Sequence, residues 1–356
     1  MTTSSSNGIR PIAVRFGALG DMVMFRPVLE ALAARWGAPV DLITSGAWTP
    51  AVLGDLEAVG DLVQMPGTRR RPFWLSPAKR RLVDWLTARQ EAPVFIFERN
   101  QKFDEFLVRA KVPSDRIARL PASVHHGHDI DLQVSLARTS LAPLRPIADD
   151  LQPGCPALPV SIEAREGATA WLAEEGFDRG PVVLVQPGNK KTMRAGRLDR
   201  ASNRKYWPIE HWGTLIQGVR ETLPDAMVLV CGVPAEQAFA AEIAEAGGLS
   251  ANHAVADRLP LERLFAVQTL AHSMISVDTG PAHTAAAVGC PATVFFGQTN
   301  PIRHLPRGSA PVVGVLHDGL FDPEDPHWTP VRLEDVAPER VLEGWRRLCD
   351  SIRSPA

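Results

Sequence analysis

The sequence predicts an α/β fold with two Rossmann-like domains, each built on a mainly parallel sheet, that face each other across a cleft. Short apolar runs alternate with stretches of helical apolar spacing in both halves of the chain, as in parallel sheets covered by helices on both faces. In each half a turn containing glycine, at 17–21 and at 278–281, joins an apolar run to a helical stretch. Parallel sheets bind ligands beyond the carboxyl ends of their strands, where such turns lie.

Prolines mark the division between the halves. Five of them lie in Ala142–Pro159, a composition typical of a linker. We therefore expect an N-terminal domain at 1–165 and a C-terminal domain at 166–333. A terminal helix at 334–356 is expected to pack back toward the N-terminal domain.

In the N-terminal half, the first apolar run is followed by Gly17-Ala18-Leu19-Gly20-Asp21. The two glycines permit a tight turn and a close approach of the backbone. Asp21 would lie at the strand's carboxyl end, either as a functional carboxylate or simply as a helix N-cap. The expected strands are Pro11–Phe16, Val40–Thr44, Asp61–Met65 and Pro93–Phe97, and the expected helices are Met22–Trp36 and Phe103–Ala110.

The C-terminal half repeats the pattern, and its most informative turn follows Met274–Val277. Pro281 suits the first helical position, and Thr279 or Asp278 can cap the helix. The free N–H groups after Gly280 favour an anion, although a capped helix start without a ligand fits as well. The other expected strands are Pro181–Val185, Met227–Gly232, Ala292–Gly297 and Pro311–Leu316, and the expected helices are Ser161–Glu175, Trp207–Leu223, Pro234–Ala246, Leu261–Ala271, Ala282–Val288 and Val336–Ile352.

Three polar segments leave alternatives open. The stretch Asn189–Tyr206 is strongly basic and either gathers an anion or is a solvated, disordered loop. Around Phe73-Trp74, basic triplets at 69–71 and 79–81 form a solvated surface or a patch for an anionic acceptor or membrane. His125, His126 and His128 are loop histidines or, as the alternative, metal ligands. The cations of the first stretch are Lys190, Lys191, Arg194, Arg197, Arg200, Arg204 and Lys205, against one acid, Asp199.

Bulk properties narrow the class of protein. The net charge of −2 argues against binding nucleic acid by charge alone. Four scattered cysteines indicate reduced, mostly buried thiols in a cytoplasmic protein, without a zinc site or a disulfide framework. We expect no membrane span, and the first ten residues look like a polar tail and not a signal peptide.

Four segments carry a family likeness: VRFGALGDMVMFRPVLEAL, FERNQKFDEFLVRAK, KYWPIEHW and SVDTGPAHTAAAVGCPATVFFGQTNP. They resemble the heptosyltransferases of glycosyltransferase family 9, which transfer heptose from ADP-heptose during assembly of the lipopolysaccharide core. The chain departs from the family pattern in its longer and more basic insert at 189–204. It also has Gln298-Thr299-Asn300 where proline-threonine-aspartate is commoner.

The resemblance implies a GT-B fold and an inverting transfer that needs neither a metal ion nor a cofactor. It makes the N-terminal domain the acceptor side and the C-terminal domain the nucleotide-sugar side. Asp21 corresponds to the family's catalytic carboxylate, and Gly17 and Gly20 belong to the loop around it. Lys205 corresponds to the lysine that contacts the donor diphosphate.

The remaining site residues implied by the resemblance contact the donor. Asp278, Thr279, Gly280 and His283 correspond to the turn that binds the donor phosphates. Glu236 lies near the position of an acidic residue that meets the ribose, and Leu259 lies where backbone atoms meet the adenine.

Elementary chemistry agrees with these roles. A carboxylate can accept the acceptor's proton late in the reaction, while a helix N-terminus and a lysine stabilise the departing diphosphate. The expected partners are an ADP-sugar and an anionic glycan or lipid-linked acceptor, with peripheral contact at the inner membrane surface. The alternatives are a GT-B transferase or epimerase that uses another nucleotide sugar, or a nucleotide-sugar-binding protein without catalysis.

Overall fold

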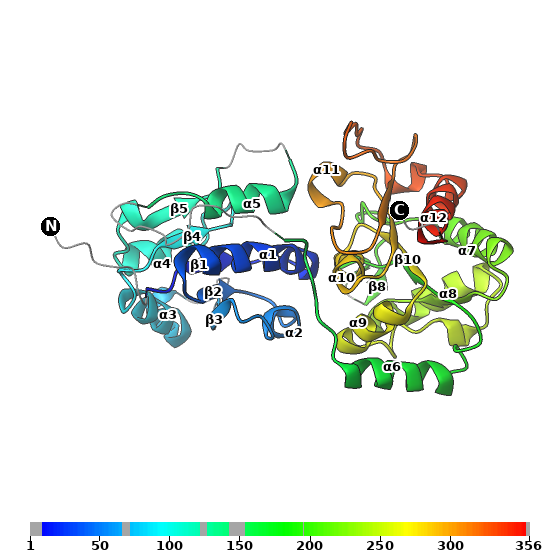
Figure 1. The fold of residues 1–356 in the computed structure, drawn as a ribbon, viewed down its shortest axis with the longest axis horizontal. Helices are drawn as coiled ribbons and strands as arrows, with labels where there is room; N and C mark the ends of the chain where they lie inside the picture. The colour runs from blue at the N-terminus through cyan, green and yellow to red at the C-terminus, as the bar shows by residue number, and fades with distance from the viewer. Residues whose placement is uncertain (1–8, 66–71, 122–126, 142–153, 195, 354–356) are drawn as a thin grey trace. The chain divides into compact units, whose positions relative to one another are not determined.

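The computed structural model describes residues 9–65, 72–121, 127–141, 154–194 and 196–353. The chain divides into two compact units, Met1–Gly154 and Cys155–Ala356 (Figure 1). Each unit contains a five-stranded sheet in which every pair of neighbours is parallel. The predicted α/β class with two mainly parallel sheets is therefore confirmed, and the cleft between the domains stays a prediction.

The N-terminal sheet has the order β3-β2-β1-β4-β5. Its strands are β1 (Ile12–Arg15), β2 (Val40–Thr44), β3 (Val59–Gln64), β4 (Val94–Ile96) and β5 (Ile117–Arg119). The chain builds outward from β1 to β3 and then crosses to the other side of β1 to form β4. The direction of winding therefore reverses between β1 and β4, and a crevice at such a switch point is where open α/β sheets bind ligands.

Successive side chains of a strand point to opposite faces of the sheet. The strands of this sheet are apolar on both faces, so helices cover both. Phe95 and Phe97 pack against Trp36 and Phe25 of α1, with ring centroids 6.2 and 4.7 Å apart. On the other face, Val94 and Ile96 join a buried cluster with residues of α3 and α4. The helices of this unit are α1 (Leu19–Trp36), α2 (Thr49–Leu53), α3 (Pro77–Thr87), α4 (Asp104–Arg109) and α5 (Asp129–Ala137), with short 3₁₀ turns at Phe73–Leu75 and Ser114–Arg116.

The C-terminal sheet has the order β12-β11-β10-β6-β9. Its strands are β6 (Val182–Gln186), β9 (Met227–Val230), β10 (Ser273–Val277), β11 (Ala292–Phe295) and β12 (Val312–Val315), and a separate hairpin pairs β7 (Met193–Arg194) with β8 (Arg197–Leu198). Here the winding reverses between β6 and β10, so both loops that follow these strands meet at one switch point.

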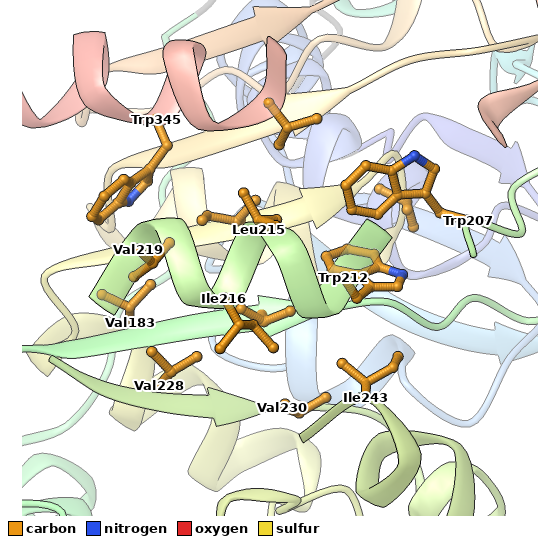
Figure 2. Close-up of a cluster of buried hydrophobic side chains, with 14 of the residues drawn as sticks. Val183, Trp207, Trp212, Leu215, Ile216, Val219, Val228, Val230, Ile243 and Trp345 are labelled. Atoms are coloured by element: carbon orange, nitrogen blue, oxygen red, sulfur yellow. The ribbon is translucent and has the colours of Figure 1, made fainter. Parts of the chain in front are cut away.

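Alternating strand residues again divide the core into two layers. Val183 and Val185 face α7, α8 and α12, and Figure 2 shows part of this layer around Trp207, Trp212 and Trp345. The neighbouring residues of β6 face α6, α9 and α10. The helices are α6 (Ile162–Glu174), α7 (Ile209–Thr222), α8 (Gln237–Ala246), α9 (Leu261–Leu270), α10 (Gly280–Val288), α11 (Pro301–His304) and α12 (Pro338–Arg353), with 3₁₀ turns at Pro234–Glu236, Ala251–His253 and Leu333–Asp335.

The terminal helix α12 is part of the C-terminal unit, where it packs on α7, β11 and β12. Its expected contact with the N-terminal domain stays a prediction. The cysteines are free thiols, and Cys231, Cys290 and Cys349 are buried whereas Cys155 is exposed. Across the described ranges, every helix is too short or too polar to cross a membrane.

Candidate functional site

The C-terminal switch point brings a lysine and an aspartate together from distant parts of the sequence. Lys205 lies in the loop between β6 and α7, and Asp278 directly follows β10. The Lys205 Nζ lies 2.7 Å from Asp278 Oδ2 and also donates a hydrogen bond to the Asp278 carbonyl oxygen. The lysine side chain keeps 30% of its surface exposed, so these contacts do not enclose it completely.

Asp278 is almost enclosed, with 8% of its side chain exposed. His283 Nε2 lies 3.8 Å from its second carboxylate oxygen. Burial by itself would raise the pKa of Asp278, but the ammonium of Lys205, followed by His283 and His304, outweighs burial and holds that pKa well below its usual range. Asp278 is therefore a fixed negative charge that orients the groups around it.

The helix α10 begins directly beside this pair. Its N-cap residue is Thr279, whose side chain makes no capping hydrogen bond, and Pro281 is its second residue, one position later than predicted. The carbonyl oxygen of Pro281 accepts hydrogen bonds from Gln268 Nε2 and Thr284 Oγ1, both at 2.9 Å, which fixes the first turn. A helix N-terminus carries partial positive charge, so this turn adds to the field of Lys205.

A second carboxylate, Glu236, lies at the same edge of the sheet. It is 4% exposed and accepts the Val233 N–H at 3.0 Å. A Cβ atom on Gly188, just beyond β6, would lie 2.4 Å from Glu236 Oε1, so a side chain there would displace the Glu236 carboxylate. Burial raises the pKa of Glu236, although the Val233 N–H and the Thr192 hydroxyl oppose this shift. The side chain of Leu259, in contrast, is part of the hydrophobic core.

The described residues of the basic stretch before Lys205 are folded, which is contrary to one of the two forms considered for it, a solvated, disordered loop. Its base is closed by Asn189, which receives the Lys191 N–H on its side chain and donates Nδ2 to Asn203 Oδ1 at 3.3 Å. Asn203 also accepts the N–H of Lys205 at 3.1 Å. The hairpin of β7 and β8 extends from this base, and the basic stretch that contains the hairpin carries cations that are exposed to solvent. These are Lys190, Lys191, Arg194, Arg197, Arg200 and Arg204.

Trp207 anchors the other side of Lys205 in the core. Its ring lies beside that of Trp212 (Figure 2), with centroids 4.8 Å apart. The Phe295 ring centroid is also 4.8 Å away, and the Trp207 Nε1 donates to the Val336 carbonyl at 2.9 Å. The sequence segment KYWPIEHW therefore has a clear physical role, because the buried tryptophan fixes the backbone two residues after the lysine.

The N-terminal switch point holds a different cluster. Asp21 is the third residue of α1, and its Oδ2 accepts the Ala18 N–H at 2.7 Å, so it is not the N-cap residue itself. Its Oδ1 lies 3.0 Å from Arg15 Nη2. A Cβ atom on Gly17 would lie 2.4 Å from that of Asp21, which explains glycine at this position. Gly20 is buried in the same first turn.

Glu98 completes this cluster, and sequence reasoning missed both it and Arg15. Glu98 follows β4, and its Oε1 lies 3.5 Å from Arg15 Nη1 and accepts the Phe16 N–H at 2.7 Å. The available signal was an acidic residue directly after the apolar run Pro93–Phe97. The predicted site residues thus form two groups, one in each unit, with Leu259 apart from both as a core side chain.

The other polar candidates either have a structural role in a helix or lie outside the described residues. His128 caps α5, with its Nδ1 accepting the Ile130 N–H at 3.2 Å, whereas His125, His126 and the triplet 69–71 lie outside the described residues. Lys79 is buried in α3, where Arg80 and Arg81 are exposed. In the described part of the chain, no three histidine, cysteine or acidic side chains are grouped as metal ligands.

Comparisons with known proteins agree with the resemblance in the sequence. Residues 179–317 match the model of glycosyltransferase family 9 (heptosyltransferase). Lipopolysaccharide heptosyltransferase 1 of Escherichia coli is 35% identical over 102 residues, which are 27% of this chain and 29% of that relative. The sequence match thus spans less than a third of the curated relative's length.

The structural likeness extends further than the sequence match. The structure of E. coli ADP-heptose lipopolysaccharide heptosyltransferase II has a TM-score of 0.68 at 17% identity, over 97% of this chain and 100% of that one. E. coli heptosyltransferase WaaC with ADP gives 0.61 at 19% identity, over 95% and 99% of the two chains. The resemblance to glycosyltransferase family 9 is therefore confirmed, and the fold of its GT-B heptosyltransferases extends over nearly the whole chain.

Proposed function

We propose that this chain is an inverting, metal-independent glycosyltransferase that moves heptose from ADP-heptose onto a hydroxyl group of a glycan acceptor. The observation that carries this proposal is the Lys205–Asp278 pair beside the N-terminus of α10. A diphosphate needs a cation and free N–H donors at one place, and this switch point offers both. Both residues lie within the segment that matches the family.

The donor diphosphate would bind Lys205, the backbone of Thr279 and Gly280, and His283. Asp278 would repel a phosphate directly, so we assign it the positioning of Lys205 and His283 instead. During transfer the bond between the anomeric carbon and the diphosphate oxygen breaks, and the electron pair stays on ADP. The cation and the helix N-terminus would stabilise that charge in place of a metal ion, each contributing about 2–4 kcal/mol in a dry site.

The nucleoside would occupy the same edge of the C-terminal sheet. The Glu236 carboxylate can accept hydrogen bonds from ribose hydroxyls, and it lies at the ends of β6 and β9, next to the Lys205 loop. By resemblance, backbone atoms of Leu259 would meet the adenine. The buried side chain of Leu259 is compatible with this role, because only its backbone is required.

Asp21 would act as the general base on the acceptor side. The acceptor oxygen forms a bond to the anomeric carbon as its proton passes to the Asp21 carboxylate. Attack from the face opposite the diphosphate inverts the anomeric centre. Gly17 and Gly20 would keep the turn around Asp21 compact. The proposal requires Asp21 and Lys205 to act on the same donor molecule.

For the acceptor we propose an anionic glycan of the lipopolysaccharide core, the acceptor class named for the relatives. The exposed cations of the basic stretch around the β7–β8 hairpin and the exposed Arg80 and Arg81 of α3 would favour such a ligand and contact with the inner membrane surface from the cytoplasm. These charges act over about 10 Å at ordinary ionic strength, so they would assist encounter with the acceptor more than they would fix its position.

A donor screen tests the proposed function. The full chain is incubated with ADP-heptose, and separately with UDP- and GDP-sugars, together with a truncated lipopolysaccharide acceptor, and the products are weighed by mass spectrometry. We expect one added heptose from ADP-heptose, unchanged by EDTA, and an inverted linkage by NMR. Transfer from another donor would replace the proposed donor. Conversion of the sugar nucleotide without acceptor would indicate an epimerase, and ADP binding without any transfer would indicate a non-catalytic binding protein.

A further inference from the structure

At the N-terminal switch point, one guanidinium lies between two carboxylates. The Nη2 of Arg15 contacts Asp21 at 3.0 Å, and its Nη1 contacts Glu98 at 3.5 Å. The exposed fraction rises from 11% for the Glu98 side chain and 13% for that of Arg15 to 29% for that of Asp21. Exposure to solvent therefore increases along the cluster from Glu98 through Arg15 to Asp21.

Glu98 has one contact that fixes the first residue of the turn leading to Asp21 and one that fixes its own side chain. Its Oε1 accepts the Phe16 N–H at 2.7 Å, and its Oε2 accepts Asn100 Nδ2 at 2.9 Å. The pairing of β1 with β4 ends with the Phe97 N–H donating to Val14, so the Glu98 side chain extends the attachment of β1 to β4 beyond the ladder. The turn that begins at Phe16 is thereby held at its first residue.

Arg15 is held from the same strand end. Its Nη1 also donates to the Phe97 carbonyl at 3.1 Å. With Phe97 and Glu98 on one side, the guanidinium has little freedom, and its Nη2 remains directed at Asp21. A planar guanidinium fixed in this way transmits its position to the carboxylate that it binds.

We propose that Glu98 is a positioning residue for Asp21, acting through Arg15 and through the Phe16 backbone. The inference rests on the proposed role of Asp21 as general base. The positive charge of Arg15 is shared between two carboxylates, so Asp21 is held in place without receiving the whole charge. Without the charge of Glu98, Arg15 would pair with Asp21 alone, and a more tightly paired carboxylate is a poorer proton acceptor.

The isosteric variant Glu98→Gln tests this role, because its amide oxygen can still accept the Phe16 N–H. We expect kcat to fall about tenfold, while KM for ADP-heptose and Kd for ADP stay within about twofold, since the proposed donor contacts lie in the other unit. The acid limb of the pH–kcat profile should move to lower pH, because removing the charge of Glu98 leaves the charge of Arg15 to Asp21 alone. Among the described contacts, Arg15 is the charged group that touches Asp21, and Glu98 is the charged group that touches Arg15.

Two further variants guard against misinterpretation. Arg15→Lys keeps the charge but loses the planar fork, so it should also lower kcat with little change in ADP affinity. Glu105→Gln is the matched control, because Glu105 pairs with Arg109 at 2.9 Å on the same unit and its side chain is 52% exposed. The control should keep the kcat, KM and pH profile of the wild-type protein.

The positioning role would be refuted by wild-type kcat and pH profile in Glu98→Gln, or by a parallel loss of ADP affinity and melting temperature that indicates general damage. Crystal structures of the wild-type protein and Glu98→Gln keep the test independent of the reaction. If the wild-type chain transfers no sugar, the proposed function fails. A displaced Arg15 and Asp21 in the variant would still support the positioning role, and unmoved side chains would overturn it.

Discussion

The two units place an aspartate at the switch point of the same kind of sheet, but they surround it differently. Asp21 is in the first turn of α1 with 29% of its side chain exposed, and it shares Arg15 with Glu98. Asp278 precedes α10 with 8% exposed, between Lys205 and His283. The topology supplies the position in both units, while burial and the partner cation decide what the carboxylate can do.

The two aspartates have similar positions in the fold, but their surroundings suit them to different roles, one to orient a cation and the other to accept a proton. Asp278 has a pKa far below its usual range because Lys205 and His283 outweigh the effect of burial, so it cannot take a proton at neutral pH and instead orients a cation. Asp21 is more exposed, and it is the carboxylate that we propose accepts the proton of the acceptor. Variants at both sites test this difference in role between Asp21 and Asp278.

Asp21→Asn should give the largest loss. The amide cannot accept the proton of the acceptor hydroxyl, so we expect the rate of transfer to fall at least about a hundredfold. Binding of ADP, measured by calorimetry, should be unchanged because the proposed donor contacts belong to the other unit. Transfer at the wild-type rate would show that Asp21 is not the general base, and the proposed difference in role between Asp21 and Asp278 would be wrong.

Lys205→Met should weaken ADP binding about 10- to 100-fold, as expected for a lost charged hydrogen bond. It also leaves Asp278 buried without its main cation, so the free energy of unfolding should fall by about 1–3 kcal/mol, a range reduced for the partial exposure of the lysine. The double variant Lys205→Met with Asp278→Asn should recover much of that stability but none of the affinity. Recovery of both would show that Lys205 only neutralises Asp278.

Gly17→Ala should lower transfer about tenfold by displacing Asp21, because the new methyl group would lie 2.4 Å from the Asp21 Cβ. Steady-state kinetics at saturating donor measures the loss, and ADP affinity serves as the internal control. Gly127→Ala is not a suitable control, since φ is +93° there and alanine would be strained. Gly167→Ala has open space and should leave the kinetics unchanged.

Glu236→Gln should have the smallest effect and extends the comparison to a buried acid for which no ion pair is found among the described residues. Burial raises the pKa of Glu236, so its contribution to stability is present below the unfolded-state pKa and is lost as pH rises through the folded-state value. The variant should therefore unfold at a higher temperature than wild type at pH 7 to 8, with little difference near pH 4. ADP affinity should fall a few fold. A difference in stability that is equal at both pH values would contradict the assigned cause.

Local patterns were sufficient to predict most strands and both glycine turns. Apolar runs such as Val40–Thr44 are buried strands, and the turns at 17–21 and 278–281 do join strands to helices. The helix α3 and the short strand β5 were not predicted, because the first was treated as a cluster of charges and the second lacks a continuous apolar run. Tertiary pairing with β4, not propensity, makes Ile117–Arg119 a strand.

The site was predictable where one segment carried several of its residues, as in Asp278–His283. It was not predictable where partners are far apart in sequence. Arg15 and Glu98 meet only because β4 lies beside β1, and local pattern does not determine strand order. The pairing of Lys205 with Asp278 likewise depends on β10 returning to the side of β6. The resemblance to a family identified Lys205 and Asp278 separately, but it did not predict the ion pair between them.

The closed base of the basic stretch has a consequence for engineering and divergence. Asn189 and Asn203 tie its two ends together before the chain reaches Lys205, and Trp207 fastens it afterwards. The tip of the β7–β8 excursion can therefore be shortened, recharged or replaced by a reporter peptide without displacing the lysine. Under the proposed function, sequence changes at this tip would alter contacts with the acceptor and leave the Lys205–Asp278 pair in place.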